Sequence, residues 1–308
     1  MTTLKTFFRN ILLLVSVFLS GSCSAPSTTS EIILVGSTPG DELIKSLLSI
    51  PTDTKVDFIN WNLKLNDGSD NQNSFVLDIN FGESQPNTLG FINGGKKSAF
   101  EGIFIVSKNE NMNIGSEIYH LKSKRLPNSI SMIKISKNLF HILTPQNQLM
   151  IGNGGWSYSL NRKEPVGSDK ILISSSISED QSLQLVFDGR TPCQEIASEH
   201  PEMNVSQSCF KLKWRLILNR DSVSHRPTAY TIRKVVDNIP RDVSGKWIII
   251  KGTVSNPDVV IYQLDPDKPQ ESFSFLVGDD NVLFFLNKRN DPYIGNENNS
   301  YTMNKKLQ

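Results

Sequence analysis

The sequence contains few of the residue types from which catalytic and metal centres are built. Three cysteines and four histidines occur among 308 residues. A phosphate-binding loop, a nucleophile elbow of the form G-x-S-x-G and a zinc-binding H-E-x-x-H segment are all absent from the sequence. The glycine-rich segment 152–155 stands between two predicted strands, so we interpret it as a turn. We therefore predict a protein without catalytic residues and without a resident cofactor.

An excess of charge of one sign is also missing. The formal net charge is +1, and 32 lysines and arginines face 31 aspartates and glutamates. Nucleic-acid-binding proteins gather their basic residues on one face or along one helix, which gives the electrostatic attraction to phosphates. The longest basic clusters here are short and are interspersed with acidic residues. We expect no nucleic-acid partner.

A single apolar run is long enough to draw attention, and it lies at the N-terminus. Residues 11–19 are mainly apolar, follow Lys5 and Arg9, and are succeeded by small residues before Cys23. This layout is typical of a secretory signal, and the run is too short for a permanent membrane span. The segment resembles a bacterial lipobox. That resemblance implies a lipoprotein signal peptide at 1–22 and acylation of Cys23 with palmitate-type chains; an ordinary signal peptide cut nearby is the alternative.

The residues after Cys23 predict where the anchor holds the protein. Segment 23–30 is rich in serine, threonine and proline, a composition typical of a flexible tether. Several acyl chains hold a protein stably at a membrane, whereas one chain does so only marginally. In lipoproteins with a similar lipobox, a serine after the cysteine favours the outer membrane, and Ser24 stands there. We expect a lipid-anchored protein of the outer membrane that faces the periplasm or the cell surface.

The remainder of the chain consists of two copies of one domain. Two blocks align without a gap: 36–66 with 189–219, and 101–162 with 244–305. A repeat this long indicates a duplicated globular domain and not a solenoid. The predicted organisation is a first β-barrel copy at 31–162, a linker at 163–170 and a second copy at 171–306.

Both copies have the sequence periodicity of β-strands. Apolar and polar residues alternate through 58–65 and through 212–218, as expected for strands with one face on a core. Similar short runs, separated by turn residues, occur at 75–81, 103–107, 117–121, 131–135 and 139–143, and at 229–235, 247–251, 259–264, 272–277 and 282–286. About eight strands per copy predict an all-β fold of two tandem, small, antiparallel, lipocalin-like barrels. A sandwich is the alternative, and short helices are expected at 41–49 and 194–199.

The second copy carries a family resemblance. Gly189-Arg190-Thr191-Pro192-Cys193 ends a strand, a tryptophan-containing strand follows at 209–219, and an aromatic strand closes the copy near 300–303. This order resembles the N-terminal β-barrel domain of the NlpE family of copper-homeostasis and envelope-stress lipoproteins. The resemblance implies a non-enzymatic envelope protein that acts through protein or metal interaction. The family's first cysteine normally stands in C-x-x-C, the feature associated with copper, whereas here Gln194, Glu195 and Ile196 follow Cys193.

Comparison of the two copies bears on the cysteines. Cys193 and Cys209 occur only in the second copy, and the residues aligned with them are Gly40 and Val56. Their joint absence indicates that they act as a pair, and a pair in an exported protein is normally oxidised. We predict a disulfide between them that contributes about 3 kcal/mol to the stability of the folded state.

A metal site is the rival interpretation of the same loop. Side chains that suit Cu(I) or another metal crowd this segment: Cys193, Glu195, Glu199, His200, Met203 and Cys209. The ligands of that hypothesis are Cys193, His200, Met203 and Cys209. Apart from this hypothesis, His200 and His225 are expected on solvated loops, and His141 is expected in the core or at the rim of the first copy.

Aromatic residues that the two copies share complete the set of candidates. Trp61 aligns with Trp214, and Tyr119 aligns with Tyr262. We interpret them as core residues. If they lined a barrel mouth instead, the protein would be a lipocalin-like carrier of a small apolar ligand, which is the alternative function. The leading hypothesis is a lipoprotein with an envelope protein partner.

Overall fold

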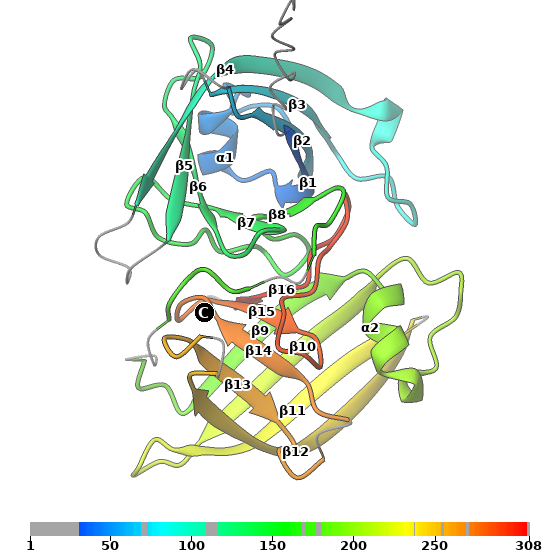
Figure 1. Cartoon of the computed structure of the whole chain (residues 1–308). Helices are drawn as coiled ribbons and strands as arrows, with labels where there is room; N and C mark the ends of the chain where they lie inside the picture. Colours follow the sequence, from blue (N-terminus) through cyan, green and yellow to red (C-terminus); the bar gives the residue numbers. More distant parts are fainter. Residues whose placement is uncertain are drawn as a thin grey trace, which may run out of the picture.

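The computed structural model describes residues 31–68, 73–108, 116–167, 170–175, 180–236, 238–253, 256–268 and 271–306. The predicted signal peptide, Cys23 and the tether lie outside the described residues. Within them the chain forms two closed antiparallel barrels of eight strands each, stacked one on the other (Figure 1). The barrel prediction is confirmed, and the sandwich alternative is wrong because each sheet closes on itself.

The first barrel is a simple meander in which each strand pairs with the next along the chain. Its strands are β1 (Glu31–Pro39), β2 (Phe58–Asn66), β3 (Ser74–Gly82), β4 (Lys96–Lys108), β5 (Glu117–Lys122), β6 (Ile130–Lys134), β7 (Leu139–Ile142) and β8 (Ser159–Arg162). Helix α1 (Glu42–Leu47) follows β1, and a 3-10 turn, η1 (Ile92–Gly94), precedes β4. In Figure 1, α1 lies within the mouth of the barrel.

The second barrel repeats this topology. Its strands are β9 (Gln184–Thr191), β10 (Leu212–Arg220), β11 (Pro227–Val236), β12 (Ile239–Lys251), β13 (Val260–Leu264), β14 (Ser274–Val277), β15 (Val282–Leu286) and β16 (Thr302–Lys305). Helix α2 (Gln194–Glu199) and a 3-10 turn, η2 (Pro201–Met203), follow β9. The two helices therefore occupy the same place in the repeat, as the sequence predicts.

A glycine sits at the seam where each barrel closes. A β-carbon on Gly36 would stand 2.7 Å from the carbonyl oxygen of Ser159, and one on Gly189 would stand 2.7 Å from that of Thr302. These contacts join the first strand of each barrel to the last. Because any larger residue would push the seam apart, the aligned glycines are explained by barrel closure.

Two strands are longer than the sequence periodicity predicts. The runs 103–107 and 247–251 are the ends of β4 and β12, which begin at Lys96 and Ile239. Most side chains in the early parts of these strands are exposed. The strands extend because their backbones pair with β3 and β11. Backbone pairing does not require alternating apolar residues, so the periodicity of the sequence does not predict it.

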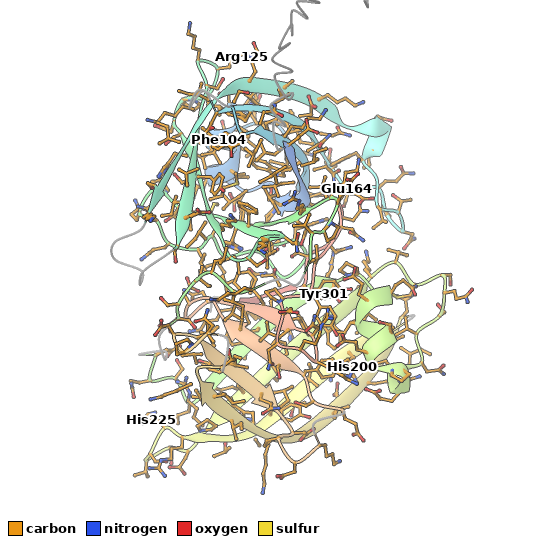
Figure 2. The ribbon with its side chains drawn as sticks, viewed as in Figure 1. Phe104, Arg125, Glu164, His200, His225 and Tyr301 are labelled. Carbon is orange, nitrogen blue, oxygen red and sulfur yellow. A yellow bond between two sulfur atoms is a disulfide. The ribbon has the colours of Figure 1, made fainter. Side chains whose placement is uncertain are left out.

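Core side chains fill the space that each sheet encloses (Figure 2). Trp61 and Trp214 are 2% and 3% exposed, and each indole Nε1 donates a hydrogen bond of 2.9 Å to a threonine hydroxyl, Thr38 or Thr191. The two copies thus keep the same buried aromatic and the same partner for its polar atom. This confirms the interpretation of the shared aromatics as core residues.

The barrels meet through an apolar interface. Strands β6 and β7 of the first barrel and β14 and β15 of the second contribute buried side chains to one cluster. Ile171 and Ile173, which lie between the barrels along the chain, are each 5% exposed and belong to the same cluster. The stretch just before β9 therefore packs in the interface.

Candidate functional site

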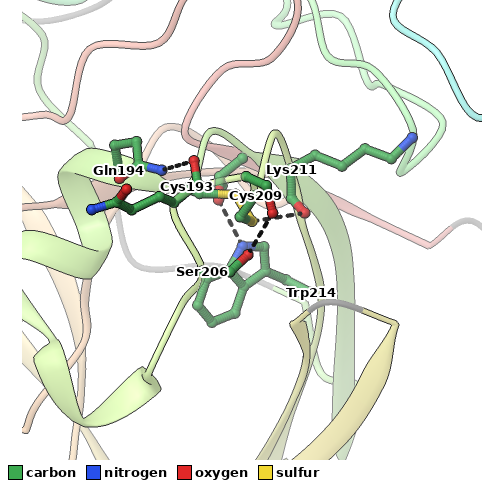
Figure 3. The surroundings of a disulfide bond; sticks show 9 residues. Cys193, Gln194, Ser206, Cys209, Lys211 and Trp214 are labelled. Atoms are coloured by element: carbon green, nitrogen blue, oxygen red, sulfur yellow. Dashed lines mark hydrogen bonds between the residues drawn. A yellow bond between two sulfur atoms is a disulfide. The ribbon is translucent and has the colours of Figure 1, made fainter.

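The predicted disulfide is present at the mouth of the second barrel. Cys193 and Cys209 are bonded through sulfur, and their α-carbons lie 6.0 Å apart (Figure 3). Cys193 is 2% exposed and immediately precedes α2, while Cys209 lies just before β10. The bond joins two residues that are 16 positions apart, and the loop between them contains α2 and η2. It joins the helix to the strand that carries Trp214.

Backbone hydrogen bonds of ordinary length hold the loop around the disulfide. The backbone nitrogen of Cys209 donates to the carbonyl oxygen of Ser206 at 3.1 Å, and the tryptophan of β10 lies just beside the bond (Figure 3). The surroundings of the sulfur atoms are core side chains, since Cys193 belongs to the apolar cluster of the barrel. The environment is that of a structural cross-link.

The other residues of the metal hypothesis do not assemble a site around the sulfurs. His200 is 2% exposed and its ring stacks on that of Phe273 at 4.2 Å, so the prediction of a solvated loop histidine is wrong. Burial lowers the pKa of His200, although a hydrogen bond with Glu202 opposes this effect. Met203 is buried in the barrel core. Among the described residues, no three His, Cys, Asp or Glu side chains are grouped as a metal site requires.

A hydrogen bond between Tyr293 and Glu199, here called the latch, also holds α2 at the same mouth. The hydroxyl of Tyr293 donates to Glu199 at the end of α2 at 2.7 Å, and the same carboxylate accepts from the backbone nitrogen of Lys288 at 3.0 Å. Burial, followed by the neighbouring carboxylate, raises the pKa of Tyr293. The tyrosine therefore stays protonated and donates to the glutamate. This latch has no counterpart in the first copy, where Met150 takes the place of Tyr293.

The mouth of the first barrel is closed without a covalent bond. A β-carbon on Gly40 would stand 2.4 Å from the side chain of Val56, so the residues aligned with the two cysteines also touch. Asp41 caps α1 by accepting from the backbone nitrogen of Ile44 at 3.0 Å, and it also accepts from the hydroxyl of Tyr158. Packing and hydrogen bonds here do what the disulfide does in the second copy.

The interface between the barrels has approximate two-fold symmetry. Ser157 and Ser300, which the repeat aligns with each other, are hydrogen-bonded at 2.6 Å, and the aligned pair Ser159 and Thr302 is bonded at 2.8 Å. Contacts between aligned residues are the mark of a self-complementary interface of the kind found in symmetric dimers.

Two reciprocal hydrogen bonds flank that pair of contacts. The backbone nitrogen of Gly152 donates to Oδ1 of Asn304 at 2.7 Å. The backbone nitrogen of Gly295, which aligns with Gly152, donates to Oδ1 of Asn161 at 2.7 Å. Because Asn161 aligns with Asn304, these bonds are the same contact made in both directions. The duplicated halves thus pack as the subunits of a symmetric dimer would.

His141 lies in this interface and breaks its symmetry. Its ring meets that of the aligned Phe284 edge-on at 5.6 Å. The ring nitrogens pair with the hydroxyl of Ser159 at 3.0 Å and the carbonyl oxygen of Met150 at 2.9 Å. Full burial lowers the pKa of His141 to about 4, so the imidazole is neutral at pH 7. The prediction of a core or rim histidine agrees with its burial, but the ring faces the second barrel and not the interior of the first.

Sequence reasoning did not predict this interface, although a signal for it was present. The run Val282–Leu286 is apolar at every position and buried at every position. A strand that is apolar on both faces is covered on both faces. The run predicts a strand, and the first barrel covers the outer side of that strand.

Comparisons with known proteins add no further identification. The chain matches no protein-family model, no curated protein and no solved structure. Of the helices in the described part of the chain, none is long and apolar enough to cross a membrane.

Proposed function

We propose that this protein is a non-enzymatic lipoprotein of the bacterial envelope that acts through contacts on the outside of its double barrel. The proposal includes acylation at Cys23, a position in the outer membrane and a role in envelope-stress sensing. The NlpE-like order of motifs and the signal-like N-terminus support these parts. The observation on which the proposal chiefly rests is that the space enclosed by both sheets is filled.

The filling argues for action at the surface over transport of a ligand. In the first barrel, Ile44 of α1 is fully buried against the strands, and in the second barrel Ile196 of α2 is fully buried in the same way. A carrier barrel keeps an open lumen of a few hundred Å³ for its ligand. Opening such a space here would require displacement of a helix that is capped in one copy and cross-linked in the other. The carrier function is therefore less well supported than a surface function.

The same geometry weighs against copper as the main activity. Cu(I) binds the thiolate form of cysteine, and both sulfurs of the candidate site are bonded to each other. His200, a third candidate ligand, stacks on Phe273 and pairs with Glu202. Protein interaction therefore has the better support of the two roles that the family resemblance implies.

The anchor is tested by labelling. Cells that express the full chain or Cys23→Ala are fed a palmitate analogue, and their membranes are separated by density. The wild type is expected to take up label and to fractionate with the outer membrane, whereas Cys23→Ala remains unlabelled. Label on both proteins, or on neither, would contradict the assignment of Cys23.

The partner is sought by cross-linking intact envelopes and recovering the full chain. Recovery of a specific envelope protein that is lost when exposed residues of the barrel are replaced would support a surface-acting sensor. A lipid or other apolar molecule retained in native mass spectra would instead favour the carrier. Copper titration of the wild type and of Cys193→Ser provides the corresponding test of the metal role.

A further inference from the structure

A large cleft lies on the outer face of the first barrel. Its volume is about 850 Å³, within the range of about 300–1,000 Å³ that is typical of small-molecule sites. Outward-facing residues of β1 to β4 form its floor, and Glu297 and Asn298, from the loop between β15 and β16, form one wall. The second barrel thus supplies one wall of the cleft.

The floor is built from amide side chains in register. Asn60 lies directly opposite Asn80, and Asn62 lies directly opposite Asp78 on the neighbouring strand. An amide offers both a donor and an acceptor, so a floor of asparagines can bond hydroxyl groups in either direction. Asn60 also donates to the hydroxyl of Ser37 at 2.6 Å and to the carbonyl oxygen of Glu297 at 3.3 Å, which fixes the wall to the floor.

The floor holds polar atoms without a partner. The Oδ1 atoms of Asn62 and Asn80 are both shielded from solvent and accept no hydrogen bond from the described residues. A buried acceptor that remains unsatisfied destabilises the folded state, and such atoms are uncommon in folded proteins. The side-chain nitrogen of Asn80 is used, since it donates to the carbonyl oxygen of Gly94 at 3.1 Å. Both residues line the cleft, and a ligand with donors would satisfy these acceptors.

The charges around the cleft are balanced. Asp78 and Glu297 are acidic, Lys97 and Lys163 are basic, and none of the four is in an ion pair among the described residues. A strongly charged ligand is normally met by side chains of the opposite sign. The cleft therefore suits a ligand that is polar and uncharged.

The cleft also continues beyond its main volume. Asn298 lines a neighbouring hollow of about 160 Å³ together with Ser84, Gln85 and Thr88. The hollow is also lined by Phe58 and Trp156 and by the basic residues Arg190 and Lys211. A ligand that extends into it would contact aromatic and basic side chains as well as hydroxyls.

The same face of the second barrel carries ion pairs instead, which provides an internal comparison. Arg215 aligns with Asn62, and Arg233, which lies opposite Arg215 as Asp78 lies opposite Asn62, corresponds to Asp78. Arg215 pairs with Asp188 through two bonds of 2.7 and 2.8 Å, and Arg233 pairs with Asp242 through two bonds of 2.7 Å. These bidentate pairs satisfy one another and leave no amide floor. The feature therefore belongs to the first copy and is not a general property of the fold.

We infer that this cleft binds an uncharged, hydroxyl-rich oligosaccharide. Sugar hydroxyls supply the donors that the two Oδ1 atoms lack and accept from the amide nitrogens, while the balanced charges select against acidic glycans. This inference goes beyond the proposed function, and it is independent of the anchor and of any protein partner.

Binding is tested by calorimetry on the full chain in a detergent without a sugar headgroup. The probes are the tetramers of N-acetylglucosamine and of α-1,4-glucose, with a tetramer of galacturonic acid as the charged control. We expect at least one neutral tetramer to bind, and Asn62→Ala and Asp78→Ala each to weaken binding at least tenfold. We expect Arg233→Ala, at the position that corresponds to Asp78, to change the affinity less than twofold.

Side-chain amide resonances provide a second measurement that a fold defect would not mimic. Selective shifts of the Asn60 and Asn62 amides on addition of the tetramer, with unchanged melting of the variants, would support the site. The inference is overturned if neither neutral tetramer binds, if the acidic tetramer binds more tightly, or if Arg233→Ala weakens binding as much as Asp78→Ala. If the sugar inference fails, the proposed envelope function still stands, because that function is tested separately by labelling and cross-linking.

Discussion

Each barrel mouth is closed by a short helix at the same place in the repeat, but different contacts hold the two helices. In the first barrel α1 buries Ile44 and Leu47 and is capped by Asp41. In the second barrel α2 buries Ile196 alone and has no side chain that caps its N-terminus. The second helix instead carries the disulfide at its start and the bond from Tyr293 at its end.

The difference shows what the cysteine pair contributes. A six-residue helix has little stability of its own and depends on tertiary contacts. Where apolar burial supplies those contacts, the aligned positions hold glycine and valine. Where burial is poor, a covalent bond limits the freedom of the unfolded chain instead. The disulfide and the apolar helix face are therefore alternative solutions to one local problem.

The largest expected effect comes from removing the packing of α1. Ile44→Ala should lower the free energy of unfolding of the first barrel by about 4 kcal/mol, because it leaves a cavity under a helix with no covalent support. Hydrogen exchange resolved by mass spectrometry should report the loss in β1 to β8. The control is Leu43→Ala, which is 38% exposed in the native protein and should cost less than about 0.5 kcal/mol. Equal effects of the two variants would contradict this account.

Removal of the disulfide should act on the other barrel. The double variant Cys193→Ser with Cys209→Ser should lower the free energy of unfolding of the second barrel by about 3 kcal/mol, as expected for a bond between residues 16 positions apart. Reduction of the wild type should have the same effect. The comparison between mouths would fail if exchange rates rose equally in the first barrel, which has no cysteine among its described residues.

Lowering the pH should reduce the stability contributed by His141 on one side of the interface, whereas Phe284 on the other side cannot titrate. The pKa of His141 is about 4 in the folded protein and about 6.5 in the unfolded chain, so the unfolded state binds the proton first as pH falls. The stability that depends on neutral His141 is thus present above pH 6.5 and is lost toward pH 4. We expect a loss of about 2 kcal/mol at pH 5 relative to pH 7.5.

The residue aligned with His141 supplies the control. His141→Phe copies Phe284, which cannot titrate, and should remove this part of the pH dependence in denaturant titrations. Other groups titrate in the same range, so the informative quantity is the difference between the variant and the wild type. Parallel curves for the two proteins would show that His141 does not contribute.

The smallest expected effect concerns the helix cap. Asp41→Ala should destabilise the first barrel by about 1 kcal/mol, because the backbone nitrogen of Ile44 loses its acceptor. Gln194→Ala, at the aligned position in the second copy, should have no measurable effect on thermal unfolding. A loss of similar size at Gln194 would show that α2 is capped in solution after all.

Much of the architecture was accessible from the sequence. The repeat predicted two copies, the alternation predicted most of their strands, and the joint absence of Cys193 and Cys209 from the first copy predicted the disulfide. Each of these is a local or internal property of the chain. The true starts of β4 and β12 were not accessible, because their early residues are exposed and pair only through the backbone.

The contacts between the barrels could not be predicted in the same way. Periodicity shows that a face is apolar, but it does not name the surface that covers it. The amide cleft depends on Asn60 meeting a loop that lies more than two hundred residues away along the chain. The prediction that His200 is solvated is wrong for a related reason. The sequence indicates a loop there, and only the fold brings Phe273 against the histidine ring.

The linkage of the two halves in one chain has a consequence for how the interface can change. In a dimer of identical subunits, a substitution near the two-fold axis is made twice and meets itself across the axis. Here a substitution is made once, and the opposite surface remains as it was. That is why a histidine can face a phenylalanine at the aligned positions 141 and 284. Held together at high effective concentration by the chain, the halves are free to become different from each other.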